Sequence, residues 1–170
     1  DAAHTLLLLN SMLQLGLKSD DLLGMAAELG SDCPFFVRRS VQSASGRGDR
    51  SEPFPLDLQG IWLLLVNPGI HLSTAEAYRN TVPAIVQTGL GQLLARPEDE
   101  WQECIVNDME DFAFRKHPQI AAIKRDLLWH GACYAAMSGS GSSVFGRFVK
   151  KPSPLRMPME YRCWLLPLAL

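Results

Sequence analysis

The apolar residues among the first thirty positions recur at helical spacing and predict two helices. In the first, Leu6, Leu9 and Leu13 lie on one stripe with further apolar residues beside it, which indicates a mostly buried helix. A second helix is expected to begin at Ser19, a residue that caps helix N-termini well, and two aspartates follow in its first turn. Gly30 is expected to end this helix.

The pattern changes in the middle of the chain. Residues 41–58 contain glycines and prolines among polar residues, which predicts a strand or hairpin leading into a linker. The continuous apolar run 61–66 is followed by Asn-Pro-Gly and is typical of a buried strand. Ser73 or Thr74 is then expected to cap a short helix that continues through Tyr78.

The remainder of the chain predicts further helices and strands. Two helices are expected, one lined by Ile105, Met109 and Phe112 and the next by Ile120, Ile123 and Leu127. Residues 133–137, 144–148 and 161–166 are predicted strands, and a glycine–serine turn joins the first two. No βαβ phosphate fingerprint is present, so we expect an α+β class with an antiparallel sheet backed by helices.

Composition narrows the classes of function. Among 170 residues, 16 Lys and Arg face 18 Asp and Glu, and a net charge of −2 argues against a nucleic-acid partner. No apolar run approaches the ~20 residues of a membrane span, so no membrane partner is expected. The four cysteines contain no C-x-x-C pair and the four histidines lack ligand spacing, which predicts no metal site and reduced thiols in a cytoplasmic protein.

Three segments carry candidate chemistry, and the first is 29–36. Pro34 suits the first turn of a helix, which places Asp32 at or just before its N-terminus. Asp32 is then either an ordinary N-cap, or a carboxylate that backbone N–H groups hold beside a substrate hydroxyl as a general base.

The other two segments are 137–143 and 67–78. The glycine–serine run is either a flexible hairpin turn or a loop whose N–H groups approach an anion, and it lacks the lysine of a P-loop. In 67–78, Thr74 could contact a polar ligand and Tyr78, one turn later, could stack on a flat base. The alternative is simple capping with a core tyrosine. Residues 107–110 offer two carboxylates, most often a solvated helix face.

Taken in order, these segments resemble the GHMP kinase superfamily. The chain reads L-G-x-D-x-P-x-F at 29–36, P-G-x-x-x-S-T-x-x-x-Y at 68–78, N-D-x-E at 107–110 and S-G-S-G at 138–141. Residues 1–3, Asp-Ala-Ala, match the end of the superfamily's glycine-rich phosphate loop. The resemblance implies a GHMP kinase fold, with residues 1–55 the end of the N-terminal domain and 56–170 the C-terminal domain.

The resemblance also implies a reaction and a site. Members of the superfamily transfer the γ-phosphoryl group of ATP to an alcohol. Asp32 matches the catalytic aspartate, and Thr74 and Tyr78 match substrate-binding residues. The glycine-rich motif that supports the phosphate loop is matched by Gly139, Ser140 and Gly141. The Ser-Thr pair and Tyr78 favour a nucleotide-linked substrate.

The implied cofactors are ATP and Mg²⁺, with the metal held by the nucleotide phosphates or by residues that would precede Asp1. The expected partners are a small-molecule substrate and ATP, and the expected state is a monomer or homodimer. The phosphate loop and its lysine lie outside these 170 residues, and 150–158 replaces a helix common among relatives. We therefore expect this segment alone to be inactive and its first helix to expose apolar surface. The alternatives are another GHMP small-molecule kinase, or a non-catalytic α+β domain.

Overall fold

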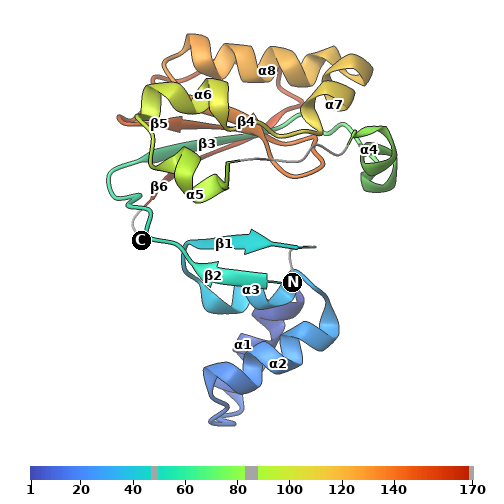
Figure 1. Cartoon of the computed structure of the whole chain (residues 1–170), viewed down its shortest axis with the longest axis vertical. Helices are drawn as coiled ribbons and strands as arrows, with labels where there is room; N and C mark the ends of the chain where they lie inside the picture. Colours follow the sequence, from blue (N-terminus) through green and yellow to red (C-terminus); the bar gives the residue numbers. More distant parts are fainter. Residues whose placement is uncertain (47–49, 83–87, 169–170) are drawn as a thin grey trace. The chain divides into compact units, whose positions relative to one another are not determined.

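The computed structural model describes residues 1–46, 50–82 and 88–168, and it divides into two compact units. They are Asp1–Asp57 and Leu58–Leu170 (Figure 1). The prediction that a boundary after residue 55 separates two domains of a GHMP kinase remains a prediction.

The first unit contains three helices and a hairpin. The helices are α1 (Ala2–Met12), α2 (Ser19–Leu29) and α3 (Cys33–Arg38). Strands β1 (Gln42–Ser45) and β2 (Arg50–Pro53) pair antiparallel, as the sequence predicts for this stretch. Its core is small and consists of Ala3, Leu22, Ala26 and Val37.

Helix α1 is not the mostly buried helix that its apolar stripe predicts. Ala3 is its one buried residue, whereas Leu8 is 58% and Met12 70% exposed. Because α1 has apolar residues around most of its circumference and packs on α2 and α3 along one side, the remaining side chains face outward. The apolar surface expected on this helix is present. The N-cap of α2 is Lys18 rather than Ser19, and the Lys18 N–H donates to the Asp21 carboxylate at 3.0 Å.

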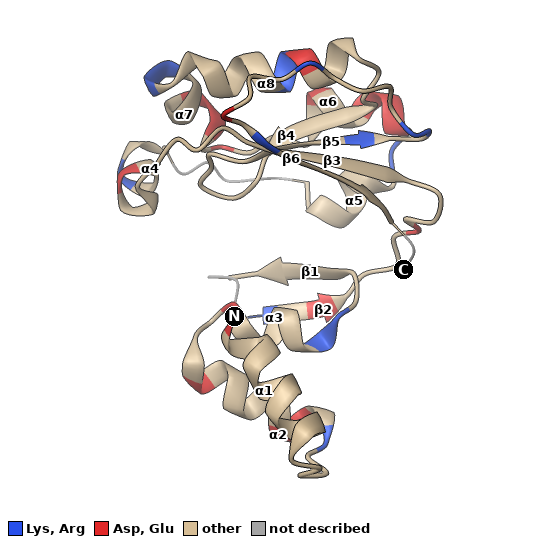
Figure 2. Cartoon of the chain, turned by 180° about the vertical axis from the view of Figure 1, so that it is seen from behind, with Lys and Arg blue, Asp and Glu red and all other residues tan. Residues whose placement is uncertain are grey.

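The second unit contains a four-stranded antiparallel sheet in the order β4-β5-β3-β6. The strands are β3 (Trp62–Asn67), β4 (Tyr134–Met137), β5 (Val144–Phe148) and β6 (Arg162–Pro167), close to the predicted bounds. In this sheet β5 and β6 each contain an arginine, whereas β3 and β4 have no charged residue (Figure 2).

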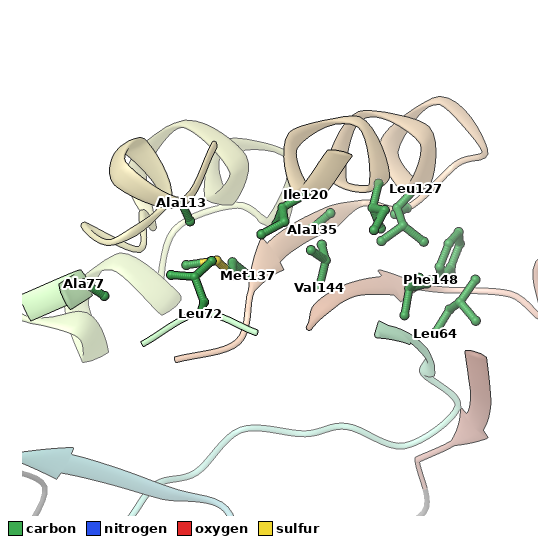
Figure 3. Close-up of a cluster of buried hydrophobic side chains, with 13 residues drawn as sticks. Leu64, Leu72, Ala77, Ala113, Ile120, Leu127, Ala135, Met137, Val144 and Phe148 are labelled. Atoms are coloured by element: carbon green, nitrogen blue, oxygen red, sulfur yellow. The ribbon is translucent and has the colours of Figure 1, made fainter. Parts of the chain in front are cut away.

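Helices α7 (Glu110–Lys116) and α8 (Pro118–Trp129) lie on one face of the sheet and form the main core with it (Figure 3). The predicted apolar face of α8 is confirmed, since Ile120, Ile123 and Leu127 are at most 2% exposed. A Cβ atom at Gly146 in β5 would come within 3.3 Å of the Leu127 Cβ, so glycine permits the close approach of α8.

The opposite face of the sheet is covered in part by 3₁₀ helix η1 (Glu98–Glu100) and α6 (Trp101–Cys104). The Arg147 guanidinium lies 5.1 Å from the Trp101 ring centroid and binds both carboxylate oxygens of Glu98, at 2.6 and 2.7 Å. The Trp101 ring also meets the Tyr134 ring edge-on. The short helices α5 (Leu90–Leu94), η1 and α6 were not predicted from the sequence.

The prediction that Ile105 lines a helix with Met109 and Phe112 is wrong. Helix α6 ends at Cys104 and α7 begins at Glu110. Between them the Asn107 side chain accepts a hydrogen bond from the Met109 N–H at 3.0 Å, which favours a turn over continued helix.

We predict that Leu127→Ala lowers the free energy of unfolding of the second unit by about 2–5 kcal/mol, because it leaves a cavity under α8. Trp129, in the same helix but 87% exposed, provides the control. Trp129→Ala should change the free energy by no more than about 0.5 kcal/mol. Urea unfolding followed by far-ultraviolet circular dichroism measures both, and equal effects would contradict the packing described here.

Candidate active site

The glycine–serine run forms a tight loop between β4 and β5. Gly139 and Gly141 both have positive φ angles, of 56° and 92°. The loop is closed by hydrogen bonds from the Ser138 N–H to the Ser143 carbonyl (2.8 Å) and from the Gly141 N–H to the Ser138 carbonyl (3.0 Å). A Cβ atom at Gly141 would lie 2.7 Å from the Met137 sulfur, so a side chain there would displace Met137 and would also be strained by the positive φ angle. The loop therefore has a hydrogen-bonded shape, and its role beside an anion stays a prediction.

The last residue of β3 and residues that follow this strand contact the loop from one side. The hydroxyls of Thr74 and Ser140 are 2.9 Å apart, and Ser142 Oγ donates to the Ile70 carbonyl. The Asn67 Nδ2 group donates to Ser143 Oγ at 2.9 Å. The structure thus brings together Thr74, predicted to bind substrate, and the predicted phosphate-supporting loop.

Helix α4 (Thr74–Asn80) carries Thr74 at its start and Tyr78 one turn later. Ser73 is its N-cap and accepts a hydrogen bond from the Glu76 N–H, as expected for one of the two predicted caps. Tyr78 is 67% exposed, so the alternative of a core tyrosine is wrong. Its ring is accessible to a flat partner.

The segment 107–110 contacts the loop from the other side. Asn107 Nδ2 donates to the carbonyls of Met137 (2.9 Å) and Gly139 (2.8 Å). Glu110 is 4% exposed and accepts a hydrogen bond from the Met137 N–H. The interpretation of 107–110 as a solvated face is therefore wrong for Glu110. In the sequence, Asn107 three residues before Glu110 at a helix start predicts a turn. It does not show that Glu110 binds the Met137 main chain.

Asp32 lies in the first unit, at the N-cap of α3 as predicted from Pro34. Its carboxylate makes no capping hydrogen bond to the helix, and the expectation that backbone N–H groups hold it is wrong. Oδ1 instead accepts a hydrogen bond from Ser31 Oγ at 3.2 Å. Asp32 and Ser31 are exposed, whereas residues 33 and 34 are partly buried.

Helices α4 and α7 are joined by an ion pair. Lys116 Nζ lies 2.6 Å from Glu76 Oε1, and both side chains are partly exposed. The hydrogen bond from Lys116 holds the pKa of Glu76 below its ordinary value of 4.5. Together with Thr74···Ser140 and the Asn107 contacts, this pair closes a ring of contacts through α4, the loop and α7.

Two cavities of the second unit contain none of the predicted site residues. One of about 530 Å³ lies beside β6 and has Leu64, Leu155 and Leu165 among its lining residues. The other, of about 250 Å³, lies next to Asn107 and Arg115. Within the described ranges, no group of three or more His, Cys, Asp or Glu side chains could hold a metal ion. No helix in the same ranges is long and apolar enough to cross a membrane.

Comparison with known proteins identifies the relatives of this chain. Residues 84–155 match the family model described as GHMP kinases, C terminal. The chain is 46% identical over 150 residues to the 4-diphosphocytidyl-2-C-methyl-D-erythritol kinase of Parabacteroides distasonis. This alignment covers 88% of the chain and 55% of that kinase. This chain is a homologue of the GHMP kinases. The kinase of the same name from Bacteroides thetaiotaomicron is 45% identical to it over 148 residues, or 87% of the chain and 54% of that kinase.

A solved structure supports the same GHMP kinase relationship. A crystal structure of 4-(cytidine 5'-diphospho)-2C-methyl-D-erythritol kinase matches with a TM-score of 0.68 and 27% identity. The match covers 85% of this chain and 53% of that chain. The predicted GHMP kinase fold of the α+β class is therefore confirmed, and the chain spans about half the length of the curated relatives it matches.

We predict that Lys116→Met raises the pKa of the Glu76 carboxyl toward its ordinary value, because the methionine removes the hydrogen bond and the charge that lower it. In the unsubstituted chain the pair stabilises the fold above pH 4.5, and this stabilisation is lost as the pH falls through the lowered pKa.

A carbon-13 NMR titration of the Glu76 side chain measures this shift. Lys116→Arg, which keeps the charge, should leave the midpoint low. If the titration midpoint of Glu76 were the same in Lys116→Met as in the unsubstituted chain, Lys116 would not be the group that lowers the pKa of Glu76.

Proposed function

We propose that the protein containing this chain transfers the γ-phosphoryl group of ATP to the 2-hydroxyl of 4-diphosphocytidyl-2-C-methyl-D-erythritol, in non-mevalonate isoprenoid precursor synthesis. The observation that carries the proposal is an identity of 45–46% to kinases of that name over nearly nine tenths of the chain. The exposed Tyr78 ring and the defined loop at 138–143 support it, because they offer a stacking surface for a base and a support for phosphates.

In this proposal the residues have distinct roles. The substrate hydroxyl oxygen attacks the γ-phosphorus, the bond to the β,γ-bridging oxygen breaks, and ADP leaves. The exposed carboxylate of Asp32 accepts the hydroxyl proton. Thr74 contacts the methylerythritol moiety, and Tyr78 stacks on the cytosine ring. Gly139, Ser140 and Gly141 support the phosphate-binding loop.

ATP enters this reaction with Mg²⁺. The nucleotide phosphates, or residues that would precede Asp1, hold the ion in this proposal, since Mg²⁺ in such sites is bound mainly through substrate phosphates and one or two carboxylates. We infer that the protein acts in the cytoplasm, as a monomer or homodimer, on small molecules and without a nucleic-acid partner.

We predict that Asp32→Asn lowers kcat of the complete gene product by about 10²–10⁴-fold and leaves the KM for ATP within about twofold, because the amide cannot accept the hydroxyl proton. Asp20→Asn, at another exposed carboxylate of the first unit, is the control and should retain full activity. A coupled ADP-release assay with the named substrate measures both. Unimpaired turnover by Asp32→Asn would remove Asp32 from the proposed mechanism, and no turnover by the unsubstituted gene product would favour a non-catalytic domain.

We predict that Tyr78→Ala weakens binding of cytidine diphosphate by about tenfold and that Tyr78→Phe does not, since a phenyl ring stacks as well as a phenol. Isothermal titration calorimetry with the complete gene product measures the affinity. Failure of the unsubstituted protein to bind cytidine diphosphate would favour another small-molecule kinase of the superfamily.

A further inference from the structure

We propose that Asn107 and Glu110 are positioning residues that hold the loop 138–143 in the shape needed to support the phosphate-binding loop of the ATP site. The inference rests on the proposed function and extends it to residues outside the predicted site. Both residues act on the loop and on the end of β4 through main-chain atoms, with no requirement to touch a ligand themselves.

Asn107 uses its whole amide group in this arrangement. The Nδ2 group donates to two carbonyls, those of Met137 and Gly139, on either side of Ser138. Oδ1 accepts from the Met109 N–H, which ties the same side chain to the turn before α7. Two carbonyl acceptors on one side and an N–H donor on the other fix the amide orientation.

Glu110 accepts a hydrogen bond from the main chain at the end of β4. Its Oε1 accepts from the Met137 N–H at 2.7 Å, and its Oε2 accepts from Lys124 Nζ at 2.5 Å. The Glu110 and Lys124 side chains are 6% and 18% exposed, so the charge is compensated where water is largely excluded. Met137 therefore has its N–H fixed by Glu110 and its carbonyl fixed by Asn107.

These contacts act where the loop is least constrained by its own sequence. Gly139 lies in the left-handed region and, as glycine, has wide backbone freedom. The contacts from Thr74, Ile70 and Asn67 reach serine side chains of the loop, whereas those from Asn107 and Glu110 reach the backbone. Loss of the backbone contacts should therefore change the loop's shape and leave the chemistry of its side chains intact.

The substitution Asn107→Asp tests whether Asn107 positions the loop, because it changes the contacts to the loop and keeps the contact to Met109. The aspartate keeps the oxygen that accepts from Met109 and places a second oxygen against the carbonyls of Met137 and Gly139, which repel it. In the complete gene product we expect the KM for ATP to rise at least about tenfold, with kcat falling by a smaller factor. Gln119→Glu adds the same charge at an exposed position of α8 and should leave both values unchanged.

Glu110 supplies a rescue test. Glu110→Gln keeps an oxygen for the Met137 N–H, whereas Glu110→Ala removes it. We expect Glu110→Gln to hold the KM for ATP within about threefold and Glu110→Ala to raise it as Asn107→Asp does. Asp111→Asn, next in the same helix but exposed, is the matched control for the loss of charge.

Amide hydrogen exchange on residues 1–170 tests the inference independently of catalysis. In Asn107→Asp the amides of Ser138 and Gly141 should exchange at least about tenfold faster, while those of Ile123 and Leu127 keep their rates. Faster exchange spread equally over the second unit, or an unchanged KM for ATP in an active enzyme, would overturn the inference. If the unsubstituted gene product transfers no phosphate, the proposed function fails, and the exchange result still decides whether Asn107 positions the loop.

Discussion

The burial of α8 against the antiparallel sheet is the constraint on which the rest of the second unit depends. Ile120, Ile123 and Leu127 are almost fully removed from water and pack on side chains of β3, β4 and β5. β4 and β5 pair antiparallel with Met137 opposite Val144, at the point where the loop 138–143 begins and ends. The candidate loop is therefore held between two strands of the hydrophobic core, and that core includes no residue of the loop itself.

Polar contacts connect the apolar core to the loop 138–143 and to α4. Lys124 projects from α8 to Glu110, and Glu110 reaches the Met137 backbone, so the helix that forms the core also anchors the polar network. Removing one partner of a buried ion pair leaves the other charge uncompensated and is strongly destabilising. The burial of Glu110 therefore requires Lys124 beside it. On the opposite side, Thr74 links the loop to α4, the helix that presents Tyr78. The network thus ties the candidate substrate helix to the candidate phosphate support.

The sequence predicted much of this fold because the signals were local. Apolar residues at helical spacing (Ile120, Ile123 and Leu127) predicted α8, and short apolar runs predicted the strands of the sheet. The prediction failed for α1, where an apolar stripe indicates burial but cannot say which neighbour covers it. It also failed at Ile105, where an asparagine turn interrupts the helical spacing.

The candidate site was predictable to a similar degree. Thr74 and Ser140 were both singled out from the sequence, but their contact is set by a long-range strand arrangement that spacing does not reveal. The sequence predicts an exposed Glu110, because a carboxylate near a helix start usually lies at the surface. Its burial depends on two partners, Met137 and Lys124, that lie 27 and 14 residues away along the chain.

The proposed function requires the protein containing this chain to phosphorylate one hydroxyl of a cytidine-linked alcohol. Phosphorus-31 NMR of the complete gene product with ATP, Mg²⁺ and 4-diphosphocytidyl-2-C-methyl-D-erythritol tests it most directly. We expect a new phosphomonoester resonance that grows in proportion to ADP and is assigned to the 2-hydroxyl. ATP that stays intact, or ADP that appears with inorganic phosphate alone, would contradict the account.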